Sequence, residues 1–118
     1  KTLGADIGVV DEQLRRGRGY DHTYLIHEKS TAPLSRFATL AVPDLTMDAL
    51  TTQPGFQLYS GNWLAGEQGK GKIPYIPRSG VALEAQGWPD AVNHPDFPSV
   101  WLTPGSRYEQ TTDYRFRR

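Results

Sequence analysis

Residues 51 to 64 read TTQPGFQLYSGNWL and combine strand-forming residues with a proline–glycine turn. A segment with strand character, Met47 to Thr52, runs into its start, and Phe56 to Ser60 gives a second strand signal within it. Nine prolines and twelve glycines divide the whole chain into short segments of this kind. This frequency of proline and glycine favours strands joined by turns over helices.

The clearest strand signal in the chain lies near the C-terminus, from Arg107 to Phe116. With a period of two, one face carries the aromatic residues and the other carries most of the charges: the first holds Tyr108, Gln110, Thr112, Tyr114 and Phe116. That face should pack while the other meets water, and in an incomplete domain it would stay bare until a second polypeptide covers it. Just ahead, Pro104 and Gly105 occupy the positions that a type II turn favours.

The remaining signals are weaker. Strand character appears in three further segments, Thr23 to His27, Arg36 to Val42 and Val81 to Ala85. Gly66 to Pro77 has no apolar periodicity and predicts a surface loop. Helix signals are limited to Val10 to Arg16, where Asp11 can cap a single turn.

Composition excludes several classes of partner. Thirteen basic residues balance thirteen acidic ones, so nucleic acid is not expected as the main ligand. The longest apolar stretch is far shorter than a bilayer span, so no membrane partner is expected. The chain has no cysteine, which excludes disulfides and thiolate metal sites and leaves the compartment open between cytoplasm and secretion.

Three segments carry a family resemblance. TTQPGFQLYSGNWL is followed from Gly80 to Phe116 by GVALEAQGWPDAVNHPDFPSVWLTPGSRYEQTTDYRF, and GRGYDHTYLI precedes both from Gly17. In order and density they resemble the C-terminal part of the aldose 1-epimerases, or galactose mutarotases. The family pattern reads TTxPGxQxYxGN, then LExQxxPDxxNxPxFP, then LxPGxxYxxxTxYxF.

The resemblance implies an all-β fold, part of a large antiparallel β-sandwich called a supersandwich. Members of the family are much longer than 118 residues. We therefore expect residues 1–118 to supply the C-terminal part of a single aldose 1-epimerase-like domain. The N-terminal half would then lie on a second polypeptide, or would have been lost by proteolysis.

The resemblance also implies a reaction, the interconversion of the α and β anomers of a free aldohexose such as galactose or glucose. A base removes the proton of the anomeric hydroxyl and an acid protonates the ring oxygen. Glu84, in GVALEAQ, matches the family's catalytic base, and its apolar sequence neighbours lead us to expect partial burial. Asp21 and Gln57 match residues that bind the sugar. No cofactor is expected, because the proton transfers balance.

The acid of the family is a histidine in the N-terminal half, and none of His22, His27 and His94 matches it. No pair of these histidines has zinc-site spacing, so no metal site is expected. Enzyme activity should therefore require the second polypeptide. The partners expected are that polypeptide and the free sugar.

Two alternatives stay open. A hexose-6-phosphate 1-epimerase would need arginines for the phosphate, and Arg15, Arg16 and Arg18 form a basic cluster that is otherwise a solvated turn. A non-catalytic carbohydrate-binding β-sandwich module would use the same fold without the reaction.

Overall fold

The computed structural model describes residues 2–27 and 33–118. Regular structure in this part of the chain is mostly strand: β1 (Asp21–Leu25), β2 (Ser35–Val42), β3 (Leu45–Thr51), β4 (Gly55–Tyr59), β5 (Glu67–Gln68), β6 (Pro74–Tyr75), β7 (Ala82–Gln86) and β8 (Thr112–Arg117). The helical elements are short: α1 (Leu3–Asp6), α2 (Glu12–Gly17), and the 3-10 turns η1 (Lys70–Lys72) and η2 (Ala91–Asn93). The expected all-β class is confirmed.

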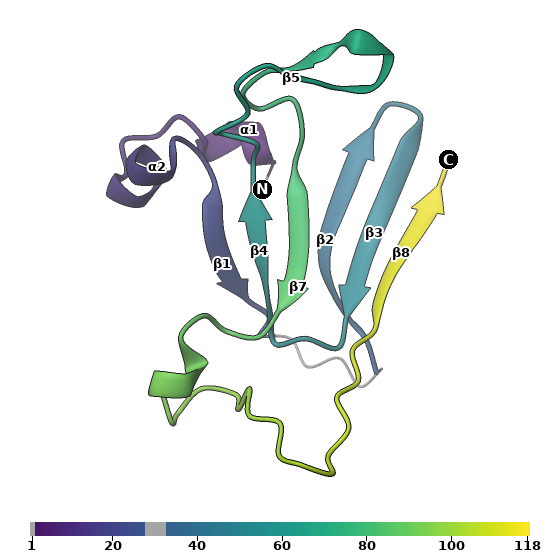
Figure 1. The fold of residues 1–118 in the computed structure, drawn as a ribbon. Coiled ribbons are helices and arrows are strands. Elements are labelled where there is room, and N and C mark those ends of the chain that lie inside the picture. The colour runs from purple at the N-terminus through teal and green to yellow at the C-terminus, as the bar shows by residue number, and fades with distance from the viewer. Residues whose placement is uncertain (1, 28–32) are drawn as a thin grey trace. The chain divides into compact units, whose positions relative to one another are not determined.

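The strands form three antiparallel sheets (Figure 1). One contains β1, β4 and β7 with β4 in the middle, and a second contains β2, β3 and β8 with β3 in the middle. The third is the small pair β5 and β6. Five of the strands expected from sequence, β1 to β4 and β7, are confirmed with starts and ends within two residues.

The chain divides into two compact units. The first consists of Lys1–His22 and Gln57–Glu84, and the second of Thr23–Phe56 and Ala85–Arg118. None of the helices in residues 2–27 and 33–118 has the length and apolarity needed to cross a bilayer.

Local chemistry explains two elements that the sequence predicts. Asp11 caps α2, because its Oδ1 accepts the backbone N–H groups of Gln13 at 2.8 Å and Leu14 at 3.1 Å. At Pro104 and Gly105 the turn is closed by the N–H of Ser106, which donates to Thr103 O at 3.0 Å, and Gly105 has a φ of +85°. Both predictions are confirmed.

The quoted stretch fixes the junction between β3 and β4 in the second unit. Pro54 O accepts hydrogen bonds from Ile26 N at 2.9 Å and from Trp88 Nε1 at 3.0 Å. A Cβ at Gly55 would lie 3.0 Å from a backbone oxygen and 3.1 Å from the Trp88 ring, so only glycine fits without displacement. Phe56, the next residue, packs on Phe37 with ring centres 4.8 Å apart.

The last strand is shorter than expected, since β8 begins at Thr112 and not at Arg107. Its partner β3 ends at Thr51, which pairs with Thr112, so no strand is available for the preceding residues. One backbone bond continues beyond the strand, from the Thr52 N–H to Thr111 O at 3.1 Å, and the Thr111 N–H donates to Thr52 Oγ1 at 3.2 Å. Farther from β8, a side-chain contact joins the segments: Gln53 Nε2 donates to Tyr108 Oη at 3.0 Å.

The aromatic face of this segment is uncovered in the described chain, as expected for an incomplete domain. Tyr108, Tyr114 and Phe116 are 63%, 49% and 63% exposed. Alternation along β8 places Tyr114 and Phe116 on one face, as expected, but nothing in the described part of the chain covers them. An exposed aromatic face of this kind is typical of an interaction surface.

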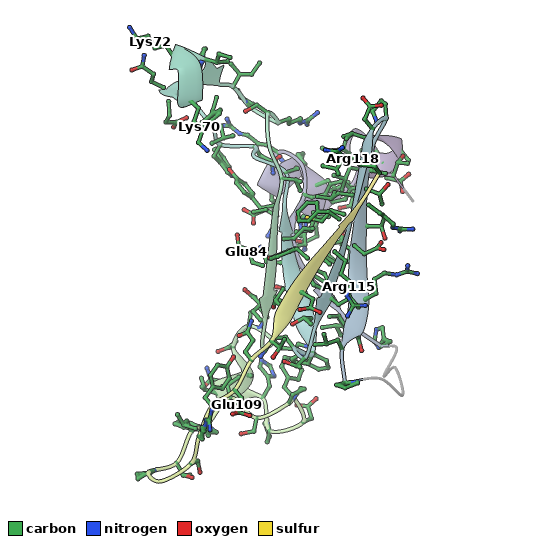
Figure 2. All side chains as sticks on the ribbon, turned by 90° about the vertical axis from the view of Figure 1, so that its right-hand side faces the viewer. Lys70, Lys72, Glu84, Glu109, Arg115 and Arg118 are labelled. Carbon is green, nitrogen blue, oxygen red and sulfur yellow. The ribbon has the colours of Figure 1, made fainter. Side chains whose placement is uncertain are left out.

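The segment Gly66 to Pro77 is exposed, as expected, but it is not a plain loop. β5 and β6 pair within it, and the Gly66 N–H donates to Tyr75 O at 2.8 Å. Lys70 and Lys72 project from its tip (Figure 2).

A charged cluster lies on the second sheet around Asp48 of β3. Its carboxylate accepts a hydrogen bond from the Thr39 hydroxyl and pairs with Arg117 Nη2 at 2.7 Å and, more weakly, with Arg36 Nη1 at 3.9 Å. The Thr39 hydrogen bond and then the two arginines hold the pKa of Asp48 below its usual value.

This pKa shift predicts a pH-dependent contribution to stability. A carboxylate with a lowered folded-state pKa stabilises the fold above its unfolded pKa of about 3.9, and the contribution disappears as the pH falls through the folded value. Asp48→Asn should therefore lower the thermal midpoint near neutral pH. The difference in thermal midpoint between this variant and the parent protein, the gap, should disappear in acid. Asp44→Asn, in the turn after β2, is the control. A gap of equal size at about pH 6 and about pH 2.5 would contradict the assignment.

Candidate functional site

The three residues proposed from sequence lie on the three strands of one sheet, in the first compact unit. Asp21 opens β1, Gln57 is central in β4, and Glu84 is central in β7. β4 lies between the other two strands, so Gln57 is on the strand that neighbours both carboxylate-bearing strands. Leu58, the next residue in β4, is buried, which is consistent with alternation of polar and apolar faces along the strand.

Asp21 and Gln57 are in direct contact. Gln57 Nε2 donates a hydrogen bond to Asp21 Oδ1 at 2.8 Å. The contact joins residues 36 positions apart in the sequence and holds a carboxylate beside an amide at the surface of the sheet. Such a pair presents acceptors and donors to a polyhydroxylated ligand.

Glu84 is exposed, so the expected partial burial is wrong for the described chain. The expectation rested on the apolar neighbours Leu83 and Ala85, but adjacent residues of a strand point to opposite faces. The Glu84 side chain projects outward from β7 (Figure 2) and makes no hydrogen bond or ion pair with any residue that the structure describes. Its carboxylate is therefore accessible.

A polar cluster, formed by the buried side chains of Ser60 and Asn62 and the backbone of Tyr20, positions Asp21. Asn62 Nδ2 donates to Gly17 O and to Tyr20 O, both at 2.8 Å, and Asn62 Oδ1 accepts from Ser60 Oγ at 2.6 Å. Ser60 in turn pairs with the Tyr20 backbone, with Ser60 N to Tyr20 O and Tyr20 N to Ser60 Oγ both at 3.0 Å. These bonds fix the backbone immediately before Asp21 to the end of β4.

Gly19 belongs to the same arrangement. Its φ is +143°, and a Cβ there would lie 2.3 Å from Asn62 Oδ1 and 2.9 Å from Ser60 Oγ. A side chain at this position would displace the cluster, so the close approach requires glycine.

Two of the three histidines make local contacts in the described chain. His22 Nδ1 accepts the Asp21 N–H at 3.1 Å, and the His94 ring stacks on Phe97 with centres 4.6 Å apart. His27 is exposed. Among residues 2–27 and 33–118, no group of three histidine, aspartate or glutamate side chains is arranged to hold a metal ion.

A separate feature of the first unit is a pocket of about 680 Å³. Arg15 and Arg18, from the basic cluster noted in the sequence, line it together with Arg78. Arg16 does not line it and pairs with Glu12 along α2. Sequence reasoning missed Arg78, which lies 60 residues from Arg18 and donates from Nη2 to Arg18 O at 3.1 Å.

Comparison with known proteins supports the family resemblance noted in the sequence. The sequence model of one family, aldose 1-epimerase, matches residues 3–115. The chain belongs to the aldose 1-epimerase family. It is 40% identical over 99 residues to galactose mutarotases of Rattus norvegicus and Homo sapiens, covering 83% of this chain and 29% of each relative. It is 36% identical over 111 residues to the aldose 1-epimerase of Escherichia coli K12, covering 92% of this chain and 32% of the relative.

The chain thus spans about a third of the length of the curated aldose 1-epimerases it matches. Within that third, sequence reasoning did not assign a role to Asn62. The available signal was the YSGN end of the quoted stretch, where an asparagine follows a strand and a glycine with a φ of +66°.

The cluster predicts that Asn62 is needed for stability. Asn62→Ala removes the donors to two backbone carbonyls and the acceptor for Ser60, which should lower the free energy of unfolding by about 1–3 kcal/mol. Asn93→Ala, at an exposed asparagine, should have a much smaller effect. Denaturant unfolding of both variants measures the difference. Equal midpoints for the two variants would show that the Asn62 hydrogen bonds do not stabilise the fold.

Proposed function

We propose that this chain provides the base and part of the sugar-binding surface of an aldose 1-epimerase acting on a free aldohexose such as galactose or glucose. The observation that best supports the proposal is the 2.8 Å contact between Asp21 and Gln57, on the sheet whose third strand carries Glu84. The relatives' names, galactose mutarotase and aldose 1-epimerase, point to the same reaction.

In the proposed mechanism, Glu84 accepts the proton of the anomeric hydroxyl. The electron pair of that O–H bond forms the carbonyl, the bond between the anomeric carbon and the ring oxygen breaks, and the ring oxygen takes a proton from a general acid. The open-chain aldehyde rotates about the bond between C1 and C2. Ring closure on the other carbonyl face then reverses the proton transfers and gives the other anomer.

Asp21 and Gln57 have binding roles in this proposal. A carboxylate accepts hydrogen bonds from sugar hydroxyls, while an amide can donate and accept, which suits a position near the ring oxygen. Their mutual hydrogen bond fixes both groups before the sugar arrives, so less conformational entropy is lost on binding.

The general acid, in our proposal, comes from a second polypeptide that carries the rest of the family domain. Two observations support an additional chain: the exposed Tyr108, Tyr114 and Phe116, and the position of β8 at the edge of its sheet. Uncovered edges and aromatic faces associate with whatever covers them. An obligate interface of this kind buries above roughly 2,000 Å².

The proposal predicts the effect of replacing Glu84. In the preparation that shows activity, Glu84→Gln should keep the fold and reduce the rate of anomer exchange by about 10²- to 10⁴-fold, because the amide cannot accept the proton. Glu109→Gln is the matched control, since Glu109 is an exposed glutamate that pairs only with nearby Arg107 in the described chain. Polarimetry gives both rates. Exchange by the Glu84 variant at the rate of the control would exclude Glu84 as the base.

A further inference from the structure

The pocket of the first unit is lined by three arginines from separate parts of the chain. Arg15 comes from α2, Arg18 from the turn that follows it, and Arg78 from the segment ahead of β7. The volume of about 680 Å³ falls within the usual range for small-molecule pockets, about 300–1,000 Å³. No step of the proposed ring opening uses these residues.

Two of the three arginines are held in place by the fold. The Arg18 guanidinium lies over the Trp63 ring, 4.3 Å from its centre, and Arg78 Nη2 donates to Arg18 O at 3.1 Å. The backbones of Arg18 and Arg78 have φ values of +56° and +68°, a region that arginine rarely adopts. Gly61 O helps to hold Arg78, because it accepts the Arg78 N–H at 2.9 Å.

Arg15 differs from these two. Its side chain makes no hydrogen bond or ion pair within the part of the chain that the structure describes. The guanidinium of this lining residue therefore keeps its five N–H donors, in the planar arrangement that matches phosphate oxygens.

The carboxylates at the pocket only partly offset this charge. Asp11 and Glu12 also line it, so three positive and two negative side chains leave a formal charge of +1. Asp11 Oδ1 is occupied by the two N–H groups that it caps, and Glu12 is paired with Arg16 outside the pocket. The remaining wall is apolar and includes Val9 and Leu14.

We propose that this pocket binds the phosphate group of a small phosphate monoester. Arg15, Arg18 and Arg78 would hold the phosphate oxygens by charge-assisted hydrogen bonds, and the apolar wall would contact the carbon skeleton. A hexose 6-phosphate belongs to this ligand class. The proposal is independent of the role assigned to Glu84, because binding requires no proton transfer.

Calorimetric titration of the protein with inorganic phosphate at low ionic strength tests the site. Saturable binding is expected, and Arg15→Gln should weaken it about tenfold or more, the usual size of a lost hydrogen bond to a charged group. Arg118→Gln is the control: it removes the same charge from an exposed arginine that does not line the pocket, and it should leave the affinity within about twofold. Equal unfolding midpoints of the two variants show that folding is unaffected.

Competition identifies the ligand class. Glucose 6-phosphate should displace inorganic phosphate from the pocket, and glucose should not. Glu84→Gln should bind phosphate as the parent protein does. Loss of epimerase activity and loss of phosphate binding are therefore distinguishable results. Absence of saturable phosphate binding would overturn the proposal. Equal weakening by Arg15→Gln and Arg118→Gln would also overturn it, because that result would mean a general charge effect.

Discussion

The buried amide of Asn62 is the contact on which the first unit depends. The segment between α2 and β1 passes through left-handed backbone at Arg18, and its carbonyls at Gly17 and Tyr20 are partly buried. Buried carbonyls without donors are costly, and Asn62 supplies donors to Gly17 O and Tyr20 O. Asp21 follows this segment directly, so its position beside Gln57 follows from the same bonds.

The same segment connects the two candidate sites of the unit. Arg18 lies between Gly17 and Gly19, so the bonds that fix Asp21 also place the Arg18 carbonyl that Arg78 contacts. Asp21 and Gln57 provide a polar surface suited to sugar hydroxyls, whereas the arginine pocket is suited to an anion. A loss of Asn62 would therefore disturb both sites, while a change at Arg15 would disturb one.

Sequence reasoning succeeded where the governing interactions are local or strongly patterned. The Asp11 cap, the turn at Pro104 and Gly105, and the strands around the quoted stretch depend on neighbours in the chain. It failed where distant residues decide the outcome. β8 starts late because its partner β3 ends. The burial expected of Glu84 failed for a local reason, because adjacent residues of a strand point to opposite faces. The arginine pocket needs residues 60 positions apart, which no local pattern shows.

The central claim is that this chain carries the base and sugar-binding residues of an aldose 1-epimerase and that the acid lies on another polypeptide. The most direct test is exchange NMR of the α and β anomers of galactose. The chain would be measured alone and then mixed with a polypeptide that supplies the rest of the family domain. We expect no exchange above the buffer rate with the chain alone and rapid exchange after mixing, lost again with Glu84→Gln. Rapid exchange by the 118-residue chain alone would contradict the account, because the acid would then have to be one of its own residues.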